Sequence, residues 1–232
     1  MIHHITKAEN KLFKKWAQDL RKKGILTKSE RIYEDGIPFP EIYSKCRVKT
    51  VFVLREPNFD DEHHYYDLRE AIKKSNNGVE WWEQRVGPLC RAILPCATGD
   101  KEPHEECLRY FGYIQLKKIG GGPQATPGAI MAAVERDAEL LREQFNIYKP
   151  DIVIACGLGR NNPFSLLENV LFAGQCECLI SRIRPRQCTK RTRGGKTFYI
   201  LEAHRPSARS SKEMRMEELA NNFYSLTKLG RS

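Results

Sequence analysis

The sequence predicts an α/β fold, a three-layer α/β/α sandwich with a central parallel sheet of four strands. Four short apolar runs, rich in β-branched and aromatic residues, alternate with stretches of helical pattern. Each run is apolar throughout, which is typical of parallel strands buried on both faces. A length of 232 residues suits one such domain, or one domain with a small appendage.

The chain begins with an amphipathic segment that predicts a helix over residues 9–23. Leu12, Phe13, Trp16 and Leu20 fall on one face of this helix, and Gly24 ends it. Residues 25–46 have turn signals and no regular pattern. We therefore expect residues 1–46 to form a helical extension packed on a core domain of residues 47–232.

The first predicted strand, residues 50–54, ends abruptly at a charged turn. Pro57 cannot donate a hydrogen bond to a sheet and disfavours helical dihedrals at the residue before it. The strand therefore delivers Arg55 and Glu56 to its carboxyl end, which is where ligands bind in open α/β sheets. Two helical stretches follow, at about residues 66–74 and 80–94.

The remaining strands are predicted at residues 110–116, 151–156 and 197–201. Lys117 and Lys118 follow the second strand, and the fourth runs into His204 and Arg205. Helices are expected over about residues 126–145, 163–171 and 211–228. Because parallel strands end at one edge of a sheet, these polar groups are expected to converge on one cleft.

The positive charge is concentrated in one part of the chain. The formal net charge is +10, and residues 181–215 contain eleven basic residues against two acidic ones, a net charge of +9. A concentrated basic patch is typical of proteins that bind a polyanion. We interpret it as a nucleic-acid-binding feature, with a solvated surface loop as the alternative.

Other features of the composition narrow the class of protein. No apolar run approaches a membrane span and no signal segment is visible, so we expect a cytoplasmic protein without membrane contact. Because no secretory signal is visible, we expect no disulfide among the eight cysteines. They also lack paired zinc-site spacing, so we expect no metal or cofactor. No obligate protein partner is evident.

The order of these motifs resembles the uracil-DNA glycosylase superfamily. The turn Leu54-Arg55-Glu56-Pro57-Asn58 resembles its first motif, a carboxylate–proline turn, and residues 203–210 (AHRPSARS) resemble its late His-Pro-Ser motif. The likeness covers roughly residue 48 to the C-terminus as an order of elements. It is strongest to uncharacterised bacterial members with signatures such as DGI, LREPN and LKK.

The resemblance implies a DNA glycosylase that hydrolyses the N-glycosidic bond of a deaminated or modified base flipped out of DNA. Glu56 would stabilise the sugar cation and orient water, and His204 would stabilise the departing base. The implied substrate-binding residues are Arg55, Asn58, Phe59 and Gln115. The implied DNA-binding residues are Lys117, Lys118, Gly121, Arg205, Ser207 and Arg209.

The chain departs from the family motifs at three positions. Leu54 replaces a glycine, Gln115 replaces an asparagine, and Arg205 is inserted between His204 and Pro206. Two other interpretations stay open: a non-catalytic nucleic-acid-binding protein with the same fold, and a small enzyme acting on free nucleotides. Likewise, Arg55 and Glu56 could form a salt bridge that only fixes the turn, and His204 could be structural.

Overall fold

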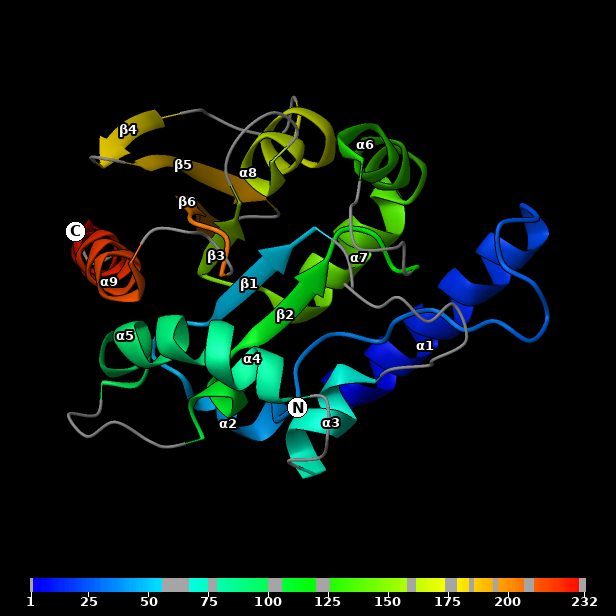
Figure 1. Ribbon diagram of the computed structural model, residues 1–232, viewed down its shortest axis with the longest axis horizontal. Helices are drawn as coiled ribbons and strands as arrows, with labels where there is room; N and C mark the ends of the chain where they lie inside the picture. The colour runs from blue at the N-terminus through cyan, green and yellow to red at the C-terminus, as the bar shows by residue number, and fades with distance from the viewer. Residues whose placement is uncertain are drawn as a thin grey trace.

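A computed structural model describes residues 2–55, 67–74, 79–99, 106–119, 126–157, 162–173, 179–183, 186–193, 196–206 and 211–229. These residues form a six-stranded sheet with the order β2-β1-β3-β6-β5-β4 (Figure 1). The four predicted strands are present and parallel: β1 (Thr50–Leu54), β2 (Gly112–Gln115), β3 (Ile152–Cys156) and β6 (Lys196–Ala203). The prediction of a parallel four-stranded core is therefore confirmed, within a larger sheet.

Two antiparallel strands extend the predicted sheet. Strands β4 (Leu179–Ile183) and β5 (Arg186–Arg193) pair with each other, and β5 pairs with β6. Their sequence does not predict strands, because β5 (RQCTKRTR) lacks the apolar run of a buried strand. Antiparallel strands at the end of a sheet need only partial burial, so polar residues are tolerated there.

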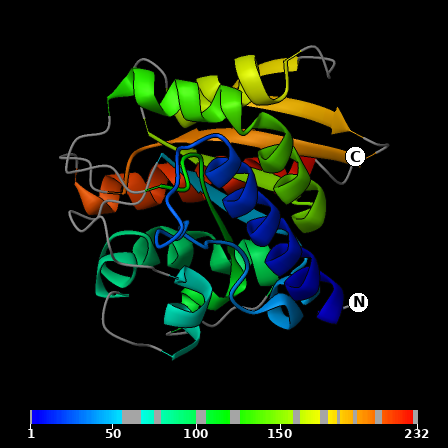
Figure 2. The same cartoon turned by 90° about the vertical axis from the view of Figure 1, so that its right-hand side faces the viewer.

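Helices cover both faces of the sheet, which makes three layers (Figures 1 and 2). The hydrophobic clusters assign the layers: one contains residues from α1, α6, α7 and α8, and the other contains residues from α3, α4, α5 and α9. The bounds of the helices are α1 (Ile2–Lys22), α2 (Pro40–Lys45), α3 (Leu68–Lys74), α4 (Glu80–Arg85), α5 (Gly87–Thr98), α6 (Pro127–Arg136), α7 (Ala138–Tyr148), α8 (Pro163–Leu166) and α9 (Lys212–Leu229). A 3-10 helix, η1 (Cys107–Tyr110), precedes β2, and a π-helical turn, η2 (Leu167–Leu171), follows α8.

The alternation of side chains along β1 divides the core in two. Val51 and Val53 lie in the cluster with α1 and α7, whereas Phe52 and Leu54 lie in the cluster with α5 and α9. Every residue of β1 is buried, as expected for a strand covered on both faces. Trp16 of α1 belongs to the first cluster, so this helix completes one of the two cores.

The predicted helix over residues 126–145 is divided at Asp137 into α6 and α7. Thr126 accepts a hydrogen bond from the Ala129 amide, and Pro127 opens the helix, as its sequence indicates. The buried Asp137 departs from helical dihedrals, with φ −103° and ψ 12°. Among the described helices, none is long and apolar enough to cross a membrane.

A short extended segment, residues 33–37, covers the outer edge of β2. Its Tyr33 amide donates to the Lys118 carbonyl over 2.7 Å, and the Tyr113 amide donates to the Gly36 carbonyl over 2.9 Å. Gly36 also forms an antiparallel bridge with Tyr113. The segment therefore satisfies backbone groups that an edge strand would otherwise expose.

Replacement of Gly36 should destabilise the fold strongly. Its φ is +133°, and a Cβ there would lie 2.3 Å from Glu9 Oε1 and 2.7 Å from the Tyr148 hydroxyl. We expect Gly36→Ala to cost at least about 3 kcal/mol of unfolding free energy, measured by urea titration. Gly24→Ala is the matched control because Gly24 also has positive φ, +67°, but no atom within 4 Å of the new Cβ. Its cost should be about 1 kcal/mol, and equal costs for the two variants would contradict this account.

Candidate functional site

The carboxyl ends of the parallel strands lie at one edge of the sheet. Leu54 of β1 is in register with Gln115 of β2, and Cys156 of β3 is in register with Ala203 of β6. The residues that follow are therefore neighbours in space as well as in the strand order. This edge is the candidate site, and it unites positions that are up to 150 residues apart in the sequence, Arg55 and Arg205 among them.

Gly157 lies at the centre of this edge, between two arginine side chains. An ideal Cβ on Gly157 would lie 3.5 Å from Arg205 Cγ and 3.8 Å from Arg55 Nε. The glycine has φ +144°, which other residues rarely adopt, and its amide donates to the Ala203 carbonyl over 2.9 Å. Gly157 is buried, and Pro163 Cδ would be nearer still to that Cβ, at 3.1 Å. The guanidinium groups of arginines at such an edge can attract and contact a phosphate oxygen.

Gln115 ends β2 with its side chain inside the protein. The residue is 3% exposed, and its Oε1 has no hydrogen-bond partner among the described residues. Leaving a buried acceptor unpaired typically costs about 1–3 kcal/mol. A ligand that donates a hydrogen bond there would remove that cost, and the imino and exocyclic amino groups of nucleobases are such donors.

His204 follows β6 and faces a carboxylate of the last helix. Its Nε2 lies 3.6 Å from Glu218 Oε2 of α9, and both side chains are mostly buried. When His204 is protonated, this contact is an ion pair. His204 thus lies at the predicted edge of the sheet, and it also contacts Glu218, which is consistent with a structural role.

The two lysines after β2 have different positions. The Lys117 amide donates to the Arg55 carbonyl over 2.9 Å, which ties the ends of β1 and β2 together. Lys118 is instead completely buried, and its ammonium lies 2.6 Å from Asp35 Oδ2. Because this ammonium is enclosed and paired, the expected phosphate contact of Lys118 is wrong for this position.

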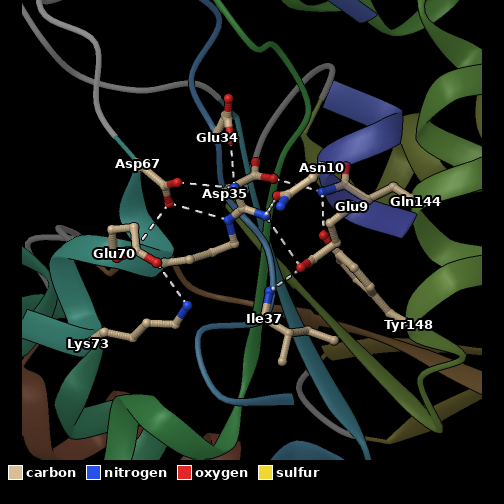
Figure 3. Close-up of polar contacts among 11 residues, drawn as sticks. Glu9, Asn10, Glu34, Asp35, Ile37, Asp67, Glu70, Lys73, Gln144 and Tyr148 are labelled. Atoms are coloured by element: carbon tan, nitrogen blue, oxygen red, sulfur yellow. Dashed lines mark hydrogen bonds and ion pairs between the residues drawn. The ribbon is translucent and has the colours of Figure 1, made fainter. Parts of the chain in front are cut away.

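Asp35 holds three buried groups with one carboxylate. Its Oδ2 accepts hydrogen bonds from the Gln115 amide and the Lys118 ammonium, both over 2.6 Å, and its Oδ1 accepts from Gln144 Nε2 over 2.7 Å. Figure 3 shows Asp35 and Gln144 facing each other. Asp35 therefore links residues 33–37, the end of β2 and α7, and it fixes the backbone of Gln115.

A second polar cluster adjoins Asp35 and centres on Arg69. Figure 3 labels the acidic members of this cluster, Glu9, Glu34 and Asp67. The Arg69 guanidinium pairs with Glu9 of α1, Glu34 and Asp67, at 3.4, 2.5 and 3.0 Å. The Glu9 carboxylate also accepts a hydrogen bond from the Ile37 amide over 2.9 Å. Burial raises the pKa of Glu9 to about 7, although Arg69 opposes the shift. This cluster fastens α1 and α3 to the segment that covers β2.

The basic segment contributes fewer surface charges than its composition indicates. Arg191 of β5 is buried and pairs with Glu168 of η2, and Arg215 of α9 is also buried. Arg205 is exposed. Part of the positive charge in residues 181–215 is therefore buried inside the protein and does not lie on its surface.

Several predicted site residues lie outside the described residues. The positions outside are Glu56, Asn58, Phe59, Gly121, Ser207 and Arg209. Within the part of the chain that the structure describes, no group of three or more His, Cys, Asp or Glu residues is placed to hold a metal ion.

Sequence reasoning missed the buried polar residues behind the site. Asp35 and Gly36 carry a turn signal and belong to the DGI signature, but neither pattern indicates a buried carboxylate. Glu9, Arg69 and Gln144 belong to no visible motif. The available signal was Lys118, a charged residue directly after a buried strand. A lysine at such a position needs a buried acid.

Comparison with known proteins finds no match: no protein-family model matches the sequence, and no curated protein matches it significantly.

Removal of the Asp35 carboxylate should destabilise the protein more than removal of a surface acid. Asp35→Ala leaves the Lys118 ammonium buried without its counter-charge, so we expect a loss of roughly 3–5 kcal/mol in urea unfolding. Asp19→Ala is the control, because Asp19 forms an exposed ion pair with Lys23 over 2.6 Å. That loss should stay below about 1 kcal/mol. Comparable losses for the two variants would show that the buried pair is not important for stability.

The raised pKa of Glu9 predicts a pH-dependent contribution to stability. The unfolded pKa is 4.5 and the folded pKa is about 7, so the folded state favours the protonated carboxyl. This contribution is full below the unfolded pKa and is lost as pH rises through the folded pKa. The stability of Glu9→Gln relative to wild type should therefore rise between about pH 5 and about pH 8, by up to about 3 kcal/mol in urea unfolding.

Glu70→Gln provides the control for this experiment. A hydrogen bond from Lys73 lowers the pKa of Glu70, so this carboxyl stays ionised in the folded and unfolded states over the same pH interval. The difference between Glu70→Gln and wild type should be constant there. A constant difference for Glu9→Gln as well would refute the assignment of the pH dependence to Glu9.

Proposed function

We propose that the carboxyl edge of the sheet binds a nucleobase and hydrolyses its N-glycosidic bond in DNA. The observation that carries this proposal is Gln115, a buried amide at the end of β2 whose oxygen lacks a partner among the described residues. A base donates hydrogen bonds from its edge, and an amide can read such an edge. The order of elements and the four parallel strands agree with the arrangement that the resemblance implies.

The charges around Gln115 support a nucleic-acid ligand. Arg55 and Arg205 flank Gly157 at the same edge, and Lys117 is joined to Arg55 through its backbone. Phosphate contacts from arginine and lysine supply much of the affinity of proteins for nucleic acid. A base inside a duplex cannot reach a buried amide, so the substrate is a flipped base or a single strand.

Glu56 is the proposed catalytic carboxylate. It is the residue directly after Arg55, and an adjacent guanidinium favours the ionised form of a carboxylate. An ionised carboxylate can stabilise the positive charge that develops on the sugar and orient the attacking water. His204 would donate to the departing base, whose negative charge develops at the same time.

The contact between His204 and Glu218 favours a second candidate function. His204 contacts the Glu218 carboxylate of α9, and such a contact is compatible with a structural role for the histidine. In that case the protein would bind nucleic acid through the same edge without catalysis. The two functions differ in one product, the abasic site.

An excision assay separates these two functions. The protein is incubated with oligonucleotides that contain uracil, hypoxanthine, xanthine or a bulky modified pyrimidine, and abasic sites are detected by alkali cleavage. We expect cleavage of at least one substrate, and a loss on the order of a hundredfold or more for Glu56→Gln with binding retained. Glu143→Gln, which changes an exposed acid paired with Lys15, is the control and should keep full activity.

One result would decide against excision, and another would decide against the role of Glu56. Tight, salt-sensitive binding without cleavage of any substrate would leave the non-catalytic function. Unchanged turnover in Glu56→Gln would remove Glu56 from the mechanism.

A further inference from the structure

A cavity beside α5 and η1 contains a cysteine that no part of the proposed function uses. The cavity has a volume of about 480 Å³ and lies among α3, α4, α5, η1 and the start of α9. Its wall includes Cys107 together with the charged side chains Glu83, Arg91, Glu106, Arg109 and Lys212. Cys107 is 2% exposed, so it forms part of the cavity wall and a molecule in the cavity would meet it there.

Cys107 has a second cysteine directly behind it. The thiol of Cys90, which is completely buried and belongs to α5, lies close enough for each thiol to shift the pKa of the other. Cys107 Sγ also donates to the Gly87 carbonyl over 3.3 Å, and Cys90 Sγ lies 3.7 Å from the Tyr113 hydroxyl. Cys107 thus belongs to the cavity wall, whereas Cys90 is not part of that wall.

The surroundings of Cys107 favour its reactive thiolate form. The hydrogen bond from Cys90 and the charge of Arg91, whose Nη1 lies 3.8 Å from Cys107 Sγ, lower the pKa of Cys107 against the effect of burial. Burial raises the pKa of Cys90 well above its usual value. The thiolate is the nucleophilic form of cysteine, so the pair is chemically unequal.

We propose that Cys107 and Cys90 form a redox site, in which Cys107 reacts with a small hydroperoxide and Cys90 then closes a disulfide. This inference is independent of the proposed glycosidic chemistry. The disulfide would join α5 to η1, the segment that leads directly into β2 and its terminal Gln115.

The reaction balances with hydrogen peroxide as the oxidant. The Cys107 thiolate attacks one peroxide oxygen, a sulfur–oxygen bond forms as the oxygen–oxygen bond breaks, and the released hydroxide takes up a proton to become water. The Cys90 sulfur then attacks the Cys107 sulfur and displaces the second hydroxide, which leaves as water with the Cys90 proton. Two thiols lose two electrons in total, and the peroxide is reduced to two waters.

Peptide mapping of the intact protein tests the site directly. The reduced chain is treated with hydrogen peroxide, unfolded, blocked with N-ethylmaleimide and digested. We expect a disulfide between the Cys90 and Cys107 peptides that dithiothreitol reverses, with loss of free thiol at both positions. Cys96→Ser is the matched control, since Cys96 is a half-buried cysteine near the end of the same helix, and it should leave this disulfide unchanged.

A second measurement separates the two roles. In Cys90→Ser the sulfenic acid should persist, so dimedone should label Cys107 on the order of tenfold more than Cys96. In Cys107→Ser, Cys90 should stay reduced. The proposal is overturned if the wild-type protein forms no Cys90–Cys107 disulfide, or if dimedone labels Cys107 no more than Cys96.

Discussion

The architecture of the candidate site depends on the buried carboxylate of Asp35. Three donors converge on it: the Gln115 amide, the Lys118 ammonium and the Gln144 side chain. Asp35 and Lys118 are both completely buried. Each supplies the counter-charge that the other needs in order to be buried in its ionised form. Lys118 also lies 5.0 Å from the Trp16 ring, which adds a cation–π contact from α1.

The ion pair of Asp35 and Lys118 joins the segment of residues 33–37 to the end of β2, where the candidate site lies. Residues 33–37 cover the edge of β2, and Asp35 lies in the middle of that segment. The adjoining Arg69 cluster fastens the same segment to α1 and α3. As a result, Gln115 is held rigidly where β2 ends, which is the pre-organisation that recognition of a base requires. The DGI and LKK sequences therefore act together, through the pair of Asp35 and Lys118.

The sequence was sufficient for the parallel core but not for the polar interior. Apolar runs such as Thr50–Leu54 and Ile152–Cys156 are strong signals because a strand buried on both faces has little choice of residue type. Strand β5 was missed because its run of basic and polar residues is typical of a loop. The partner of Lys118 was not predictable, since Asp35 lies 83 residues away and only the folded chain brings the two together. A general rule about parallel sheets predicted that Arg55, Gln115 and Arg205 would converge. The position of Gly157 between the two arginine side chains is visible only in the folded structure.

The central claim is that a nucleobase binds at the carboxyl edge of the sheet, and photochemical cross-linking tests it most directly. A single-stranded oligonucleotide with a photoreactive uracil is irradiated with the protein, and the attached peptides are identified by mass spectrometry. The account predicts attachment within the segments that follow β1, β2 and β6, including the neighbourhoods of Arg55, Lys117 and Arg205. Attachment confined to the opposite edge, near Lys49 and Lys149 where β1 and β3 begin, would contradict it.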